Sequence, residues 1–411
     1  MVAAAAGVDA LSTRLRAGAL LTALLLGGAS AWSLTAAGAG VTDLAPAYDT
    51  SLVGIGLLTT AFGVPYAIGQ IPAGMLIDRI GVRPAALLGL GMTLLAYLAA
   101  SLAPVMSLAI GARAVAGAGS AVCFVAGVEV ARRAGLGPTA LGFFGGASLA
   151  VGGAAVAVVP AAGGVLGWRS AWLTCALAAA LAIVSVALHR TPPVPLTPPR
   201  QSGPGASVLR DRELHRLALV QAVNFGMAVV LSVWAATVLE RTWGAAPGAA
   251  AGLASVILLC ATVSQPLGGY LNGRYPDRAR RITLSALVGC AAGTALLAMP
   301  SHVAVALVAV TVIGIMSGLP FAGLVTAAQA RRPERPAAAV GLLNGLANGV
   351  ILLGTPLLGA AIDHSWTTAA LLAVAGLWLA PLLALPHMWR KGPRHRVTGP
   401  LPASGGAGPP R

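Results

Sequence analysis

The chain has 411 residues, of which 57% are hydrophobic and only 9% are charged, and its mean hydropathy is +0.85. Soluble domains carry about 25% charged residues, so this composition excludes a water-soluble protein. The formal net charge of +15 would suggest nucleic acid in a soluble protein, but here the arginines follow a membrane topology and no nucleic-acid partner is expected.

Apolar runs long enough to cross a bilayer recur from residue 17 to residue 388. A membrane helix needs about 20 mostly apolar residues, and charged residues or Pro/Gly clusters separate the runs. The first run is too long for a signal peptide and is counted as a span. We therefore predict an all-α membrane protein with twelve spans, at residues 17–39, 51–73, 84–103, 106–130, 140–162, 169–189, 215–239, 249–271, 282–300, 303–328, 337–361 and 367–387.

The basic residues predict the orientation of these spans. With both termini inside, 23 of the 26 Lys and Arg residues fall in inside segments, Arg169 and Arg241 fall outside, and Arg113 lies within a span. Short cytoplasmic loops of membrane proteins carry an excess of Lys and Arg, and one span fewer would move every later loop to the other side. We expect a multi-pass protein of a bacterial inner (plasma) membrane with cytoplasmic N and C termini.

A proline-rich stretch at 191–205 divides the chain, because such a sequence behaves as a linker and forms no packed core. Pro72-Ala73-Gly74 recurs as Pro266-Leu267-Gly268 at matching places, which predicts two parallel six-helix halves, related by pseudo-symmetry, with a solute site between them. The predicted parts are a cytoplasmic N-terminal segment 1–16, an N-terminal bundle 17–189, a cytoplasmic linker 190–214, a C-terminal bundle 215–388 and a basic, disordered cytoplasmic tail 389–411.

The loop after the second span carries the most specific motif. Residues 74–84 read Gly-Met-Leu-Ile-Asp-Arg-Ile-Gly-Val-Arg-Pro. This run resembles the loop signature G-x-L-x-D-R-x-G-x-R of the major facilitator superfamily of transporters and meets every defined position. The resemblance implies the twelve-helix fold of that superfamily and a gating role for Gly74, Asp78, Arg79, Gly81 and Arg83.

The chemistry of this loop supports a gate. Gly74 lets two helices approach closely, Gly81 favours a tight turn, and Asp78 can accept hydrogen bonds from a helix N-terminus or an arginine. Such a polar latch can hold the cytoplasmic side closed in one state and release it in the other. The second half has Asn272, or Gly273 in a register one residue longer, where the first has Asp78, so we expect an asymmetric latch.

The fourth span contains Arg113, and residues 113–121 are similar to the R-x-x-x-G-x-G-x-A pattern of the same superfamily. An arginine inside a span costs about 2.5–3.5 kcal/mol on insertion scales. It can contact an anionic or polar substrate, modulate a proton site, or extend to the outer interface.

In the fifth span a set of glycines with a proline looks like the antiporter motif of the superfamily and predicts a helix kink. Ala155 and Val159 stand where that motif has glycine, so the match is partial and favours antiport only weakly. The matching residues are Gly146, Pro160, Gly163 and Gly164.

Proton coupling has one carboxylate candidate late in the fourth span, Glu129, followed closely by Arg132 and Arg133. It is either a proton carrier, through desolvation, or an ion pair on the cytoplasmic rim. The other candidates for substrate contact or proton coupling are polar or aromatic side chains within spans, for which hydrogen bonding between helices is the alternative role. They are Tyr66, Gln70, Gln221, Asn224, Trp234, Gln265, Asn344 and Asn348.

We predict a secondary active transporter that works by alternating access, most simply a proton-coupled exporter of an amphipathic or drug-like compound. The alternative within transport is uptake of a small organic or inorganic anion with Arg113 as counter-ion. A membrane-embedded enzyme is disfavoured, because the six histidines are scattered at loop ends. No catalytic residue, metal or cofactor is expected, and the expected partners are a small-molecule substrate, protons and the lipid bilayer around a monomer.

Overall fold

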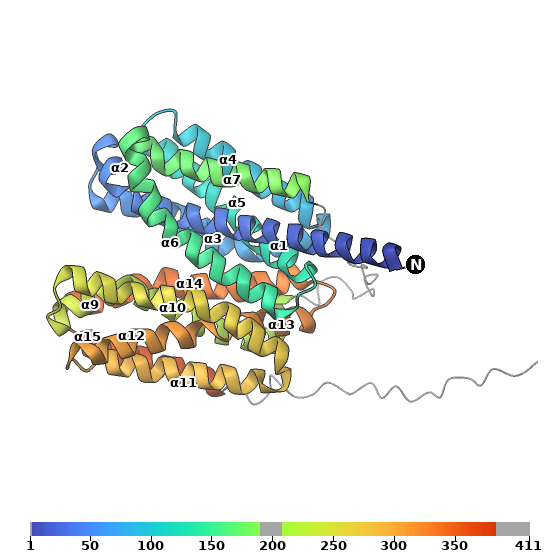
Figure 1. Ribbon diagram of the computed structural model, residues 1–411. Helices are drawn as coiled ribbons and strands as arrows, with labels where there is room; N and C mark the ends of the chain where they lie inside the picture. Colours follow the sequence, from blue (N-terminus) through green and yellow to red (C-terminus); the bar gives the residue numbers. More distant parts are fainter. Residues whose placement is uncertain (1, 190–207, 384–411) are drawn as a thin grey trace, which may run out of the picture.

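The computed structural model describes residues 2–189 and 208–383, and these ranges are helical throughout apart from short connections (Figure 1). The N-terminal half consists of α1 (Val2–Ala39), α2 (Val41–Ala47), α3 (Leu52–Ile80), α4 (Val82–Ala100), α5 (Met106–Arg133), α6 (Pro138–Leu166), the 3-10 turn η1 (Gly167–Arg169) and α7 (Ser170–Leu188).

The C-terminal half begins with the 3-10 turn η2 (Val208–Arg210) and α8 (Arg212–Gln221), which leads through the π-helical turn η3 (Ala222–Gly226) into α9 (Met227–Trp243). It continues with α10 (Pro247–Arg274), η4 (Pro276–Arg278), α11 (Ala279–Leu297), α12 (Val303–Gly318), α13 (Phe321–Arg331), α14 (Pro336–Asp363), α15 (Thr367–Leu379) and η5 (Ala380–Leu383).

These helices account for the twelve predicted spans. Ten helical segments of the described ranges are long and apolar enough to cross a membrane. One of them, 138–188, holds two predicted spans as α6 and α7, and the last predicted span is the shorter apolar helix Thr367–Leu383. The predicted fold, an all-α membrane protein of twelve helices in two six-helix halves, is confirmed.

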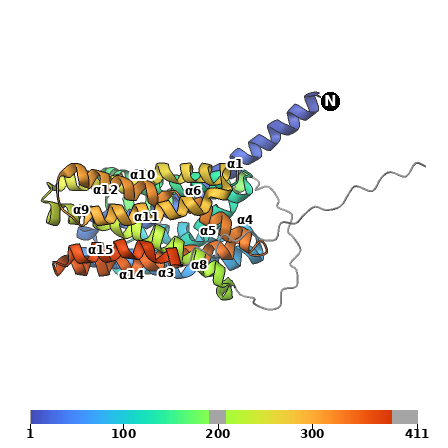
Figure 2. The ribbon, with the colours of Figure 1, turned by 90° about the horizontal axis from the view of Figure 1, so that it is seen from below.

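Three helices differ in detail from the predicted spans. Helix α1 begins at Val2, well before residue 17, and extends beyond the bundle in Figure 2. The seventh span is interrupted by η3, and the tenth is divided between α12 and α13 at Leu319 and Pro320. Proline has no amide hydrogen to continue a helical ladder, which explains the second interruption.

Two of the predicted segments fall mainly outside the described residues. Only 208–214 of the predicted linker is described, where η2 and the start of α8 are helical. The predicted tail, 389–411, lies wholly outside.

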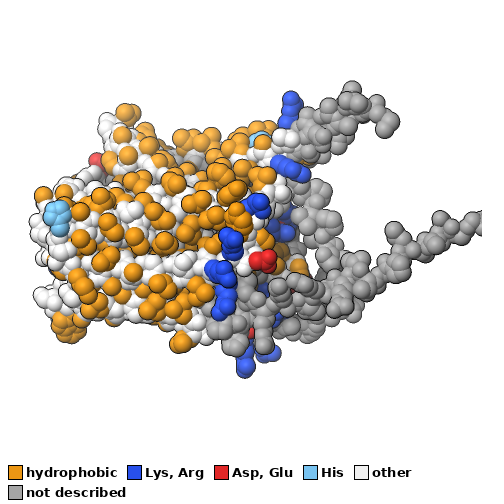
Figure 3. Space-filling model, turned by 60° about the horizontal axis from the view of Figure 1, so that its bottom comes forward, with side chains coloured by type: hydrophobic (Ala, Val, Ile, Leu, Met, Phe, Trp, Pro, Cys, Tyr) orange, Lys and Arg blue, Asp and Glu red, His pale blue; other side chains and the backbone are white. Residues whose placement is uncertain are grey.

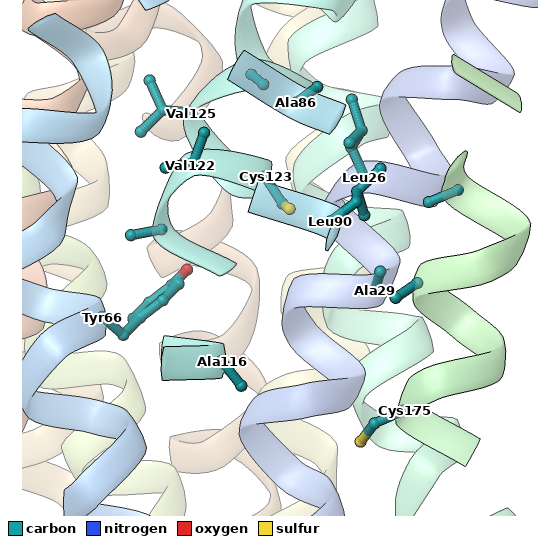
Figure 4. Packing of buried hydrophobic residues seen from close by; sticks show 14 of the residues in the cluster. Leu26, Ala29, Tyr66, Ala86, Leu90, Ala116, Val122, Cys123, Val125 and Cys175 are labelled. Carbon is teal, nitrogen blue, oxygen red and sulfur yellow. The ribbon is translucent and has the colours of Figure 1, made fainter. Parts of the chain in front are cut away.

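The buried residues form two cores, one centred in each half, and Figure 1 shows the halves as two layers of helices. The first core also includes five residues of the second half, Phe321, Ala322, Val325, Ala337 and Val340. Alanines fill much of the first core, and Figure 4 shows Ala29 and Ala86 near the larger side chains of Leu26 and Leu90. Without a hydrophobic driving force between helices in lipid, small residues stabilise a bundle by letting the backbones pack closely.

The surface has a membrane protein's distribution of side chains. Hydrophobic side chains cover the flanks of the helices, and arginine side chains gather at one end (Figure 3). We call this end the basic end. Its arginines include Arg79, Arg132, Arg133 and Arg274 in the last turns of α3, α5 and α10, and Arg83 in the first turn of α4.

Candidate functional site

At the basic end, a carboxylate of the first half binds a helix of the second half. Asp78, near the end of α3, accepts hydrogen bonds from the backbone amides of Ala337 and Ala338, at 3.2 and 2.9 Å. Both amides belong to the first turn of α14, where backbone N–H groups have no partner within the helix. The positive end of the helix dipole also favours a carboxylate. Asp78 therefore caps α14 across the boundary between the halves.

Around this cap the backbones of α3 and α14 are in direct contact. A Cβ built on Gly74 would lie closer than 3.0 Å to the backbone of Ala337 and Ala338, and one on Gly341 would overlap the Gln70 carbonyl oxygen. Real Cβ atoms do not approach so closely, so the seam between α3 and α14 requires glycine at both positions.

A second tight seam joins α6 to α10. A Cβ on Gly142 would overlap the Gln265 carbonyl oxygen, one on Gly146 the Thr262 carbonyl oxygen, and one on Gly269 would lie 2.5 Å from the Pro138 carbonyl oxygen. Both seams therefore close the basic end by backbone contact between the halves.

The same helix faces are open toward the other end. With 3.6 residues per turn, Gly63 lies on the face of α3 that carries Gly74, and Gly153 lies on the face of α6 that carries Gly142. No atom lies within 4 Å of a Cβ built on Gly63 or Gly153. The halves thus meet at the basic end and separate toward the opposite end.

The remaining residues of the gating loop have local roles. Gly81 ends α3 with φ of +91°, a conformation that side chains disfavour. Arg83 donates a hydrogen bond from Nη2 to the Ala187 carbonyl oxygen, 3.1 Å away, near the end of α7, and Arg79 is exposed. Of the five loop residues, Gly74 and Asp78 are the two that contact the other half.

Arg113 is enclosed within the first half. Its side chain has no exposed surface, donates from Nε to the Leu58 carbonyl oxygen at 3.0 Å and from Nη1 to the Tyr97 hydroxyl at 2.9 Å and the Ser33 carbonyl oxygen, and lies 4.3 Å from the centre of the Phe62 ring. Arg113 therefore joins α1, α3, α4 and α5 and does not extend to the interface, while its Nη2 has no partner among the described residues.

Glu129 is 2% exposed and accepts hydrogen bonds from two arginines of its own helix. Arg132 Nε lies 2.8 Å from Oε2, and Arg133 Nε lies 2.7 Å from Oε1. Asp78 is within electrostatic range of Glu129 and Arg132. The structure therefore places Glu129 in an ion pair at the basic end, beside the cap on α14.

The polar candidates are buried, and several lack hydrogen-bond partners in the described structure. Gln70 and Gln221 have two unpaired side-chain atoms each, and Asn224 Oδ1, Gln265 Oε1 and Asn344 Nδ2 are also unpaired. Buried polar groups are nearly always paired in folded proteins, so these amides are candidates for binding water or a solute.

The other candidates have partners in the structure. Trp234 donates to the Thr355 carbonyl oxygen at 2.7 Å, and Asn348 donates to the Asn344 carbonyl oxygen one turn away in α14. Tyr66 stacks on Phe62 with ring centres 5.5 Å apart and meets Phe124 edge to face. Trp234 thus packs within the second half.

The four residues of the antiporter-like motif lie in different surroundings. Gly146 lies in the seam with α10, and Gly163 faces the Asp43 carboxylate of α2. Pro160 is exposed, and nothing lies within 4 Å of a Cβ on Gly164. Helix α6 continues without a break past Pro160 to Leu166.

One ionic cluster was not predicted. Asp211 caps α8 by accepting from the amides of Glu213 and Leu214, and it pairs with Arg331 and Arg332 at 3.3 and 2.9 Å. These arginines end α13, just before the start of α14. The signal in the sequence was the acid before an amphipathic run, Asp211-Arg-Glu-Leu, which is typical of a helix N-cap.

Comparisons with known proteins agree with this architecture. The family model of the Major Facilitator Superfamily matches residues 20–217 and again 217–409, while a search of curated proteins found no match. The fold is similar to the fucose:proton symporter FucP of E. coli in the outward conformation, with a TM-score of 0.72, 15% identity, and coverage of 90% of this chain and 99% of that one.

Two further solved structures are similar. The human organic anion transporter MFSD10 has a TM-score of 0.72 at 17% identity, covering 91% of this chain and 99% of its own. The proton:xylose symporter XylE, bound to 6-bromo-6-deoxy-D-glucose, has a TM-score of 0.74 at 14% identity, covering 92% and 96%. The family model spans both halves, and the chain belongs to the major facilitator superfamily.

Proposed function

We propose that this protein is a secondary active transporter that moves a small solute by alternating access. The observation that carries the proposal is the cap that Asp78 places on α14 across the two halves, at 3.2 and 2.9 Å. Opening the basic end requires these hydrogen bonds to break and the two glycine seams to separate. The cap is therefore a two-state contact of the kind that alternating access needs.

The structure corresponds to the state of the transport cycle in which the basic end is closed. We assign this end to the cytoplasm, because short cytoplasmic loops carry the excess of arginine. In this assignment the site between the halves faces the outside, and the likeness to FucP in its outward conformation supports it.

For coupling and direction we propose proton-driven efflux of an uncharged or amphipathic compound from a bacterial inner membrane. Proton coupling is supported by two structural neighbours that are proton symporters, for fucose and for xylose. Efflux is supported by the partial glycine-proline motif in α6. Glu129 is not favoured as the proton carrier, because two arginines already bind its carboxylate.

Uptake of a small anion is the second candidate. Two observations favour it: Arg113 Nη2 has no partner among the described residues, and the structural neighbour MFSD10 is an organic anion transporter. Against it, the Arg113 side chain has no exposed surface and contacts three other helices of its own half, α1, α3 and α4. An anion would reach it only after those helices part.

The test is transport in proteoliposomes with an imposed pH gradient, for radiolabelled candidate solutes in both directions. Proton-driven efflux predicts solute movement against the proton flux that stops when an ionophore collapses the gradient. Movement that is unaffected by the ionophore contradicts proton coupling, and gradient-driven movement in the same direction as the protons contradicts efflux. The variant Arg113→Met tests the anion alternative. If Arg113 binds the anion, the variant should fold but lose anion transport.

A further inference from the structure

Helices α4 and α5 touch at one level and separate toward the end of the molecule opposite the basic end. A Cβ built on Gly89 would lie 2.7 Å from the Gly119 carbonyl oxygen, and one on Gly119 would lie 2.5 Å from the Gly89 carbonyl oxygen. About two turns nearer the start of α5, no atom of the described structure lies within 4 Å of a Cβ built on Gly111. Backbone contact between the two helices thus gives way to open space.

The space between the diverging helices is an apolar groove of about 290 Å³. Its walls are Ala96 and Ala99 of α4 and the residues of α5 from Ser107 to Val115 that share one face, including the exposed Gly111. Both helices are long and apolar enough to span the membrane. Helix α4 lies on the side of its half that faces away from the second half (Figure 1). The groove therefore faces lipid and not the space between the halves.

The dimensions of the groove fit one hydrocarbon chain. From Ser107 to Val115 the helix rises by about 12 Å, and one leaflet of the hydrocarbon core is about 15 Å deep. A volume of 290 Å³ spread over this length gives a mean cross-section of roughly 24 Å². A helix is about 10–12 Å across, with a cross-section of about 80 Å² or more. The groove thus has room for an acyl chain but not for a helix of a second copy.

The outer end of the groove is positively charged. Helix α5 begins at Met106 without a side-chain cap, so its first amides have no partner within the helix and form the positive end of its dipole. Ser107, in this first turn, lines the groove. Across from it, Arg169 donates from Nε to the Ser101 carbonyl oxygen at 3.0 Å, less than one helical turn beyond Ala99. A helix N-terminus and a guanidinium therefore meet at the mouth of an apolar groove.

Arg169 has donors to spare. Its side chain is exposed, stacks 4.6 Å from the centre of the Trp168 ring, and forms no ion pair with the described residues. Only one of its five N–H groups is used by the Ser101 carbonyl oxygen. Arg241, at the same end of the other half, is instead paired with Asp363 at 2.9 Å. Tryptophan is enriched at the membrane–water interface, so Trp168 places the Arg169 guanidinium at the level of lipid headgroups.

We propose that the groove binds one phospholipid with an anionic headgroup, of the phosphatidylglycerol class, in the outer leaflet. One acyl chain occupies the groove, and the phosphate accepts hydrogen bonds from Arg169 and from the first turn of α5. A lipid with a choline headgroup brings its own positive charge to this mouth and binds more weakly. The inference requires the membrane spans and their orientation but does not depend on what the protein transports.

The test is photolabelling of the protein in nanodiscs by two lipid probes, a phosphatidylglycerol and a phosphatidylcholine that carry the same diazirine-bearing acyl chain. Mass spectrometry maps the labelled residues. At equal mole fraction, the glycerol lipid should label residues 96–115 at least about fivefold more, which is the attraction that one arginine near a charged headgroup supplies. Helix α15, whose exposed leucines lie outside the groove, is the internal reference and should be labelled equally by both probes.

Two variants with matched controls separate the chain from the headgroup. Gly111→Leu fills the groove and should lower the labelling of residues 96–115 by both probes. Its control is Gly91→Leu, because Gly91 has the same open surroundings but does not line the groove. Arg169→Gln should abolish the preference for the glycerol lipid and leave labelling by the choline lipid unchanged. Arg241→Gln removes the same charge at the same end and should keep the preference. Melting temperatures show that all four variants fold.

Four outcomes would overturn the lipid site. Equal labelling of residues 96–115 by both wild-type probes would mean that the groove holds ordinary bilayer lipid. A preference that survives Arg169→Gln, or labelling that survives Gly111→Leu, would place the lipid elsewhere. Displacement of the glycerol lipid by glycerol 3-phosphate alone would indicate a site for free phosphate. Labelling that falls when two copies share one nanodisc would show that a second copy of the chain covers the groove.

Discussion

Asp78→Asn is expected to weaken the closure of the basic end. The substitution removes the charge and one of two acceptor oxygens from a cap that now takes two amides of α14, at 3.2 and 2.9 Å. A hydrogen bond to a charged group contributes about 1.5–3 kcal/mol, and the helix dipole adds a part of the same order. We therefore expect the closed state to lose about 1.5–3 kcal/mol, a change of about 10- to 150-fold in its equilibrium with the open state.

The assay is the distance between two spin labels on either side of the α6–α10 seam. Leu136, between α5 and α6, and Asp277, after α10, are both exposed and lie at the basic end of different halves. The labels require a cysteine-free background, which means replacing Cys123, Cys175 and Cys290, all buried, and the half-buried Cys260. The variant should move a large part of the population to a longer distance.

Glu213→Gln is the matched control. It removes one carboxylate at the same end of the molecule, but Glu213 pairs with Arg216 within α8 and not with the other half. An identical distance distribution in wild type and Asp78→Asn would refute the latch. Equal opening in Glu213→Gln would show that any lost charge at this end has the same effect.

Three further predictions concern the ionic groups. Arg113→Lys should lower the free energy of unfolding by about 2–4 kcal/mol, and with it the melting temperature, because an ammonium cannot reach all three acceptors and stack on Phe62. A variant as stable as wild type contradicts this role. Glu129→Gln should leave the dependence of transport on the pH gradient intact while lowering stability by about 1–3 kcal/mol; loss of that dependence at unchanged stability would make Glu129 the proton carrier. Asp211→Ala should lower the free energy of unfolding by about 1–3 kcal/mol, because it removes a helix cap and two partly exposed ion pairs. Burial raises the pKa of Asp211, but the Leu214 amide, Arg331 and Arg332 outweigh it and hold the pKa below its ordinary value. The stability difference between wild type and Asp211→Ala should therefore be complete above about pH 4 and shrink in stronger acid, and a difference that grows on acidification contradicts the assignment.

Hydrophobicity and arginine placement predicted the spans, because the bilayer imposes a length and a charge bias on every helix. They did not predict where helices are interrupted. Residues 222–226 are a π turn within an apolar run, and nothing in their hydrophobicity distinguishes them from a regular helix. Pro320 was a usable signal, since proline removes a helical hydrogen bond.

For single residues, a pattern predicted which side chains are unusual but not what surrounds them. Arg113 was singled out as unusual because an arginine is costly at membrane depth, yet the carbonyl oxygens of Leu58 and Ser33 that bind it come from helices far away in sequence. Glu129 could be paired with Arg132 and Arg133 from spacing alone, because three and four residues separate neighbours on a helix.

The two seams close the basic end with different chemistry, which bears on how the transporter opens. In the α3–α14 seam the start of α14 is capped by Asp78. In the α6–α10 seam, the start of α6 faces Gly269 and Gly273, which have no side chains to bind its amides. Asn272 instead donates within its own half, to the Gly268 carbonyl oxygen at 2.7 Å. A charge-dependent contact therefore exists on one side only. Protonation or substitution of Asp78 should weaken the α3–α14 seam, and the α6–α10 seam, which depends on shape, is then the remaining contact that must separate when the basic end opens.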